Sequence, residues 1–211
     1  MTHRRFDWLL GPGARPDNDW DVELLRTTNF AVVPSLGSLV PGWLLVVPKR
    51  PALNFSELTS NEKQELESLL VRLRAHLHRP GYVVHEFEHG SRYLGSVMGC
   101  GVDQAHLHVV PLTFDLTVSV TTTDTSEIRW SELSRGDDVW SQISGDREYY
   151  FVRNDSRSLL GITRCPRTQW IRKIIAKELG HPDAWDYRTE LGLQNIRATK
   201  RMFALPIKSK S

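Results

Sequence analysis

The hydrophobic positions of this chain change their spacing along its length, and the changes mark out strands and helices. Two short apolar runs, at residues 29–33 and 43–47, stop at Pro34 and Pro48. Runs rich in β-branched and aromatic residues and bounded by proline or glycine are typical of strands, so these two predict a hairpin. We expect the polar connection between them to line a pocket at the edge of a sheet.

The clearest helix signal follows this hairpin. Thr59 and Glu62 have the spacing of a capping box, in which each side chain satisfies a backbone amide that the first helical turn leaves unpaired. Leucines then recur three and four residues apart as far as Leu77, and Pro80-Gly81 ends the pattern. A single apolar stripe among charged residues indicates a helix that lies on one face of a sheet.

Other segments predict strands at residues 82–87, 102–112 and 149–152 and a helix at residues 168–179. This order predicts an α+β fold, an antiparallel sheet of about five strands with one long helix packed on it. Because the pattern changes near residue 120, we expect a catalytic domain at residues 1–120. Residues 121–211 would form a C-terminal α/β extension packed on that domain, where it could contribute to a dimer interface.

Composition limits the possible partners. The 211 residues include 27 Lys and Arg against 25 Asp and Glu, which gives a net charge of +2. This balance provides no general attraction for nucleic acid or for a membrane surface, although one cleft can still attract an anion. No apolar run is long enough for a membrane span or a signal peptide. We therefore expect a soluble, cytoplasmic protein without nucleic-acid or membrane partners.

The segment from Gly99 to Pro111 carries the candidate chemistry. Alternate side chains of a strand share a face, so Gln104, His106 and His108 are expected to point the same way. They would lie beside a glycine-rich turn, and the amides of such a turn can bind a phosphate.

From the residues alone, the His-x-His pair has three interpretations. It is a polar surface feature, a pair of metal ligands, or part of a catalytic site. The segment shows no obvious third ligand, and two cysteines, Cys100 and Cys165, are too few for a four-cysteine zinc site. We expect no metal in the site and no cofactor, while a divalent ion that accompanies the substrate stays open.

The segment Gln104-Ala-His-Leu-His-Val-Val resembles the signature of the histidine-triad (HIT) superfamily. Residues 29–34 and 41–49 resemble the opening hairpin of that family, and Glu88-His89-Gly90 followed by Cys100-Gly-Val-Asp resembles a bacterial subset of it. The resemblance covers about residues 20–115. It implies a HIT-like sheet-and-helix fold, usually a homodimer, that binds nucleotides and hydrolyses or transfers nucleoside phosphates.

The resemblance also implies roles for single residues. His106 matches the nucleophile, which attacks the α-phosphorus and forms a nucleotidyl-histidine. His108 matches the third triad histidine, which hydrogen-bonds a phosphate oxygen. The expected nucleotide-binding residues are Phe30 and Leu36 at the base, Ser35 at the ribose, Gly99, Gly101 and Val102 at the phosphate, Glu88 and His89 at the pocket edge, and Trp43.

Two residues depart from the family pattern. Gln104 replaces the first triad histidine, and Trp43 replaces a histidine that often follows the Pro-Gly pair. An amide can orient a neighbour but cannot relay a proton, so a leaving group that needs protonation would depart slowly. We therefore expect a hydrolase or nucleotidyltransferase that cleaves phosphoanhydrides in preference to phosphoramidates. The acceptor is left open between water, phosphate (a phosphorylase) and a metabolite.

Three further expectations remain. The alternative to an enzyme is a nucleotide-binding protein with little catalysis, because Gln104 and Trp43 replace two residues that could handle protons. Arg172, Lys173 and Lys177 share one predicted helix, for which a solvated basic face is favoured over contact with a phosphate. Cys100 is expected to be a small turn residue and not a nucleophile.

Overall fold

The computed structural model describes residues 5–11, 18–123, 127–134, 139–142 and 147–204. The helices are α1 (Asp7–Leu10), α2 (Ser60–Leu77), α3 (Leu116–Thr122), α4 (Trp170–Glu178) and α5 (Leu193–Phe203), with 3-10 turns η1 (Phe55–Glu57) and η2 (Val139–Gln142). The strands are β1 (Leu25–Arg26), β2 (Phe30–Pro34), β3 (Leu44–Pro48), β4 (Val83–Gly90), β5 (Leu107–Leu112), β6 (Ile128–Leu133), β7 (Tyr149–Arg153) and β8 (Ser158–Thr163).

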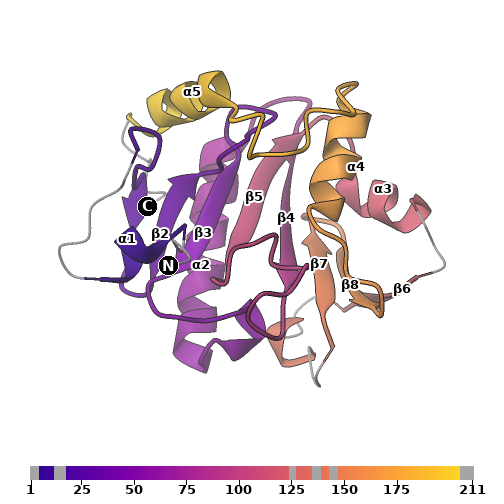
Figure 1. Ribbon diagram of the computed structural model, residues 1–211. Coiled ribbons are helices and arrows are strands. Elements are labelled where there is room, and N and C mark those ends of the chain that lie inside the picture. Colours follow the sequence, from indigo (N-terminus) through magenta and orange to yellow (C-terminus); the bar gives the residue numbers. More distant parts are fainter. Residues whose placement is uncertain (1–4, 12–17, 124–126, 135–138, 143–146, 205–211) are drawn as a thin grey trace.

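The strands form one antiparallel sheet in the order β1-β2-β3-β5-β4-β7-β8-β6 (Figure 1). The predicted α+β class with an antiparallel sheet is confirmed, but the expectation of about five strands is wrong, because the sheet has eight. Strand β7 pairs with β4 and carries β8 and β6 beyond it, so residues 128–163 widen the sheet. Strand β6 was missed because polar, exposed residues interrupt its apolar pattern.

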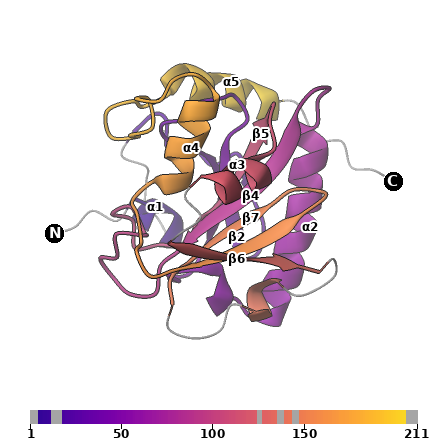
Figure 2. The ribbon, with the colours of Figure 1, turned by 90° about the vertical axis from the view of Figure 1, so that its right-hand side faces the viewer.

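Both faces of the sheet are covered, which explains why β2 and β3 are buried at every position. In β3, Leu44 and Val46 face α2, whereas Leu45 and Val47 face α1. Farther along the sheet, α3 and α4 cover the face opposite α2. Figure 2 shows α2 on one side of the sheet and α4 on the other.

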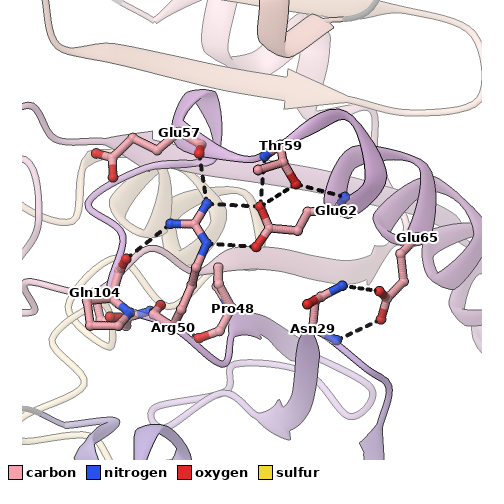
Figure 3. A network of polar contacts seen from close by, with 9 residues as sticks. Asn29, Pro48, Arg50, Glu57, Thr59, Glu62, Glu65 and Gln104 are labelled. Carbon is pink, nitrogen blue, oxygen red and sulfur yellow. Dashed lines mark hydrogen bonds and ion pairs between the residues drawn. The ribbon is translucent and has the colours of Figure 1, made fainter.

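The predicted capping box of α2 is confirmed. The Thr59 hydroxyl accepts the Glu62 N–H (3.3 Å), and the Glu62 carboxylate accepts the Thr59 N–H (2.7 Å). Arg50 pairs with the same carboxylate at 2.7 Å (Figure 3), and this hydrogen bond lowers the pKa of Glu62 to about 2. The leucine stripe from Leu66 to Leu77 is buried against the sheet.

The predicted hairpin is also confirmed, with Phe30 opposite Pro48. Its connection is held from α5, where the Thr199 hydroxyl accepts the Gly42 N–H (2.8 Å) and the Asn195 amide donates to the Ser38 carbonyl (2.7 Å). None of the helices in the described ranges is long and apolar enough to cross a membrane.

Strand β5 is shorter than expected and begins at Leu107. The preceding residues form turns, and the Ala105 N–H donates to the Ala52 carbonyl (2.7 Å) instead of to a neighbouring strand. Helix α4 likewise begins at Trp170, after Gln169 in the left-handed conformation, and not at Thr168.

Candidate functional site

A small cavity lies on the sheet face opposite α2, beside the start of β5. The centres of water molecules can occupy about 40 Å³ of it. At about 10–15 Å³ for each water, this is room for about three waters. Six of the sequence-predicted site residues line it: Ser35, Leu36, His89, Val102, His106 and His108.

His106 is held in one tautomer by the backbone carbonyl of a nearby residue. Its Nδ1 lies 2.8 Å from the Gln104 carbonyl oxygen. A carbonyl can only accept, so Nδ1 carries the hydrogen and Nε2 of the neutral ring keeps a free lone pair. Burial lowers the pKa of His106, which keeps the ring neutral at physiological pH. This is the form of imidazole that can act as a nucleophile through Nε2.

His108 is held in the opposite tautomer. The indole N–H of Trp43 lies 3.0 Å from His108 Nδ1. An indole N–H can only donate, so Nδ1 accepts and the hydrogen of the neutral ring is on Nε2. The ring stacks flat on Phe87 (4.2 Å between centroids, 5° between planes) and meets His106 edge-on at 5.1 Å. Burial places the pKa of His108 well below its usual value, so the ring offers a neutral N–H donor.

Trp43 does not line the cavity. Its ring is fully buried behind His108, so the expectation that it contacts the nucleotide is not met. Its contribution to the site is the hydrogen bond that orients His108.

His89 is the third imidazole of the cavity. It is 7% exposed, and its Nε2 is buried without a hydrogen-bond partner in the described part of the chain. Burial, with smaller contributions from the charges of His106 and Arg172, lowers the pKa of His89 to about 3. A buried polar atom without a partner is costly, and a ligand in the cavity would remove that cost.

Gln104 does not share a face with the two histidines, contrary to the prediction. It lies before the first residue of β5, where the alternation of a strand does not hold. Its side-chain amide donates to the carbonyls of Pro48 (3.1 Å) and Arg50 (2.9 Å), beside the Arg50–Glu62 pair (Figure 3). Its backbone carbonyl, and not its side chain, therefore acts on His106.

Two other predicted binding residues lie on the α2 face of the sheet. Phe30 stacks on Phe55 (6.3 Å), and Glu88 accepts the Phe55 N–H (2.8 Å) and the Tyr149 hydroxyl (2.6 Å). Burial raises the pKa of Glu88 to about 8. Strand alternation places Glu88 opposite its neighbour His89, so neither Phe30 nor Glu88 reaches the cavity.

The glycine turn does not present the expected amides. The Val102 N–H donates to the Gly99 carbonyl (2.8 Å), and the Gly99 N–H donates to the Ser96 carbonyl (3.2 Å). Gly99 and Gly101 do not line the cavity, and Gly101, at φ +79°, occupies an exposed turn that favours glycine. Two of the amides expected to hold a phosphate are thus engaged within the turn.

Cys100 lines the cavity but has the features of a turn residue. Its sulfur accepts the Gln169 N–H (3.1 Å), and burial raises the pKa of the thiol. A raised pKa keeps the sulfur as a thiol, which is the poorly nucleophilic form.

Three residues of the C-terminal region line the cavity although they were not predicted to belong to the site: Gln169, Arg172 and Tyr187. Arg172 is 3% exposed, so the expected solvated basic face is wrong for this residue, whereas Lys177 is exposed. A signal was present, because Arg172 precedes Ile175 by three residues and thus falls on the buried stripe of α4. Arg5 and Phe6 of the N-terminal segment complete the wall.

Within the described ranges, no three His, Cys, Asp or Glu side chains are grouped so that they could hold a metal ion. Both Nδ1 atoms of the His-x-His pair already have hydrogen-bond partners. His106 Nδ1 is bonded to the Gln104 carbonyl, and His108 Nδ1 is bonded to the Trp43 indole.

No family model and no curated protein matches the chain. Solved structures similar to it include a Hit-like protein involved in cell-cycle regulation from Bartonella henselae (15% identity, 43% of this chain and 66% of that chain, TM-score 0.33). They also include a hypothetical histidine triad nucleotide-binding protein from Sulfolobus tokodaii (19% identity, 42% and 58%, TM-score 0.31) and yeast Ap4A phosphorylase Apa2 (12% identity, 88% and 76%, TM-score 0.46). This chain spans less than two thirds of the length of the first two proteins. The first two of these proteins are described as a Hit-like protein and a histidine triad protein.

Proposed function

We propose that this protein is a nucleotide hydrolase or nucleotidyltransferase that acts through a nucleotidyl intermediate on His106. The observation that carries the proposal is the pair of neutral imidazoles held in opposite tautomers at one small cavity. His106 keeps a lone pair on Nε2, while His108 keeps a hydrogen on Nε2. One ring can therefore attack a phosphorus atom while the other donates to an oxygen of the same group.

The reaction has two displacements. In the first, His106 Nε2 forms a bond to the α-phosphorus, and the bond from that phosphorus to the leaving oxygen breaks with its electron pair on the oxygen. The positive charge that develops on the ring is stabilised by the Gln104 carbonyl at Nδ1. In the second, water or phosphate attacks the phosphorus, the P–N bond breaks and its electron pair returns to Nε2. Attack by water releases one proton.

The proposed substrate is a nucleoside phosphoanhydride. Its leaving group is already an anion and needs no proton, whereas an amine leaving group does. The Gln104 side chain points away from the cavity, and the lowered pKa of His89, about 3, leaves that ring unprotonated at neutral pH. Neither of them is a proton donor for an amine.

One observation favours a second candidate, a nucleotide-binding protein with little catalysis. The amides of Gly99 and Val102 are engaged within the turn, so the backbone offers less stabilisation to a transferred phosphoryl group. Binding without turnover would follow from that loss.

The test is to trap the intermediate with a dinucleoside polyphosphate labelled at the α-phosphorus. The reaction is stopped with alkaline detergent, because a phosphorus–nitrogen bond to histidine is stable in base and labile in acid. We expect a labelled protein from the wild type and none from His106→Asn, with turnover reduced at least about 10³-fold, since the nucleophile is removed.

His181→Asn, at an exposed position, serves as the control and should label like the wild type. Tight nucleotide binding without label or product would instead identify a binding protein. Stoichiometric zinc or iron in the purified protein would revive the metal interpretation of the histidine pair.

A further inference from the structure

Arg172 is a buried cation at the cavity without a carboxylate partner in the described part of the chain. Asp186, whose charge acts on it from a distance, is paired with Arg188 at 2.7 Å. The other arginine of the cavity wall, Arg5, is neutralised by Asp21 at 2.7 Å. A buried charge is costly unless an opposite charge or sufficient hydrogen bonds compensate it, so an uncompensated cation at a cavity suggests an anionic ligand.

Two backbone carbonyls hold the guanidinium of Arg172 in place and leave some of its N–H donors free. Its Nε donates to the Trp185 carbonyl (3.0 Å) and its Nη2 donates to the Gly37 carbonyl. Its carbon lies 4.8 Å from the centre of the Trp43 ring, the ring that orients His108. Two of its five N–H donors are used by these carbonyls, so three remain without a partner among the described residues.

Arg172 lies at the same cavity as the two histidines. Gln169 directly precedes α4 and Arg172 lies in its first turn, and both line the same cavity as His106 and His108. Because Arg172 and the two histidines line one cavity, an anionic group bound beside the histidines lies in the same cavity as the arginine. The charge of Arg172 also lowers the pKa of His89, His106 and His108, which shows that its field reaches all three rings.

We propose that Arg172 binds the phosphoryl group that His106 attacks, in place of the turn amides of Gly99 and Val102. The inference rests on the proposed function for the identity of the reacting group. It assigns a catalytic contact to a residue of the C-terminal region, which lies outside the His-x-His segment. The ligand that Arg172 recognises is a phosphate ester with charged oxygens, and the uncharged nucleoside lacks that contact.

The experiment compares the affinity for AMP with the affinity for adenosine by calorimetry, because the two ligands differ in the phosphate alone. In Arg172→Met, which keeps the length of the stem, we expect the AMP dissociation constant to rise at least about tenfold, the effect of losing charge-assisted hydrogen bonds. The adenosine constant should stay within about twofold. The control Lys177→Met removes an exposed cation from the same helix and should change neither constant.

Arg172→Lys provides a second variant if the methionine variant does not fold. It keeps the charge without the planar fork, so a smaller loss for AMP is expected and none for adenosine. Equal losses for AMP and adenosine would show that Arg172 only holds the Gly37 connection in place, and unchanged AMP binding would also overturn the inference.

The trapping experiment separates this inference from the proposed function. If no label forms on His106 but AMP binding still depends on Arg172, the proposed reaction fails and the phosphate contact stands. If label forms on His106 and AMP binding does not depend on Arg172, the reaction stands and the contact fails.

Discussion

At the scale of single residues, the chemistry of the site is decided by two hydrogen bonds to imidazole Nδ1 atoms. The Gln104 carbonyl accepts from His106, and the Trp43 indole donates to His108. A neutral histidine has one hydrogen to place, so each bond determines what the other ring nitrogen can do. Trp43 thus orients the His108 ring without being able to titrate itself.

Removing the Trp43 donor should therefore weaken catalysis while the fold persists. In Trp43→Phe, His108 would still stack on Phe87 but could move its hydrogen to Nδ1. We expect kcat to fall about 10–100-fold, the usual cost of losing a partner that orients a functional imidazole. Nitrogen NMR of His108 should report the mixed tautomer.

Trp130→Phe is the matched control. It also removes an indole N–H, one that has no hydrogen-bond partner among the described residues, and it should leave kcat unchanged. An unaltered kcat in Trp43→Phe would show that His108 does not act through a fixed tautomer.

At the scale of elements, central strand β4 carries ionisable groups on both faces. Glu88 points to the α2 face, and His89 points to the cavity. Burial raises the pKa of the carboxyl to about 8 and lowers the pKa of the imidazole to about 3, so both groups are uncharged in the folded state near neutral pH.

The two groups have opposite effects on the pH dependence of stability. Between the ordinary glutamate pKa of 4.5 and a value of about 8, the folded state keeps a proton on Glu88 that the unfolded chain has lost. The free energy of unfolding therefore falls as pH rises through that window, by up to about 1.4 kcal/mol for each pH unit. For His89, the unfolded chain binds the extra proton, so stability is full above pH 6.5 and falls as pH decreases toward about 3.

Glu88→Gln tests the carboxyl contribution. The amide keeps the size of the protonated acid, can accept the Phe55 N–H and can donate to the Tyr149 hydroxyl. We expect the variant to match the wild type at pH 5 and to be more stable by about 2–4 kcal/mol at pH 8, in urea unfolding. Glu178→Gln, at the exposed end of α4, is the control for the loss of a surface carboxylate. A constant difference for Glu88→Gln would mean that Glu88 is ionised in the folded protein.

The elements that were predicted correctly carry their signals locally. The capping box and leucine stripe of α2 and the proline-bounded strands β2 and β3 need no information from distant residues. Gln104 and Arg172 were misplaced because their contacts come from residues far away in the sequence. Gln104 is bonded to the carbonyls of residues 48 and 50. Arg172 contacts the Gly37 carbonyl and the ring of Trp43. Alternation also failed for Gln104 because the strand starts three residues later, a boundary that the residue types do not mark.

At the scale of the whole molecule, one sheet joins the two predicted regions. Glu86 to Gly90 of β4 pair with residues 149–153 of β7, and Tyr149 and Phe151 pack in the same core as α2. The homodimer implied by the HIT resemblance stays a prediction.

A chain that ends at residue 123 tests whether the predicted boundary near residue 120 separates independent domains. The truncation would expose one edge of β4 and remove Tyr149 and Phe151 from the core, so we expect loss of cooperative unfolding and of the near-ultraviolet circular dichroism. The full chain should unfold in one transition. A truncated chain with a native near-ultraviolet spectrum would support two separate domains instead.

Gly37 has a consequence for how a ligand could reach the histidines. A side chain there would begin 2.5 Å from Tyr187 Cβ, so the loop after β2 and the C-terminal segment touch almost backbone to backbone. The Tyr187 hydroxyl also donates to the Cys100 carbonyl (2.9 Å), which fastens a third segment to the same point. Tyr187 thus joins three segments at the cavity wall, and widening the cavity on this side requires all three segments to separate.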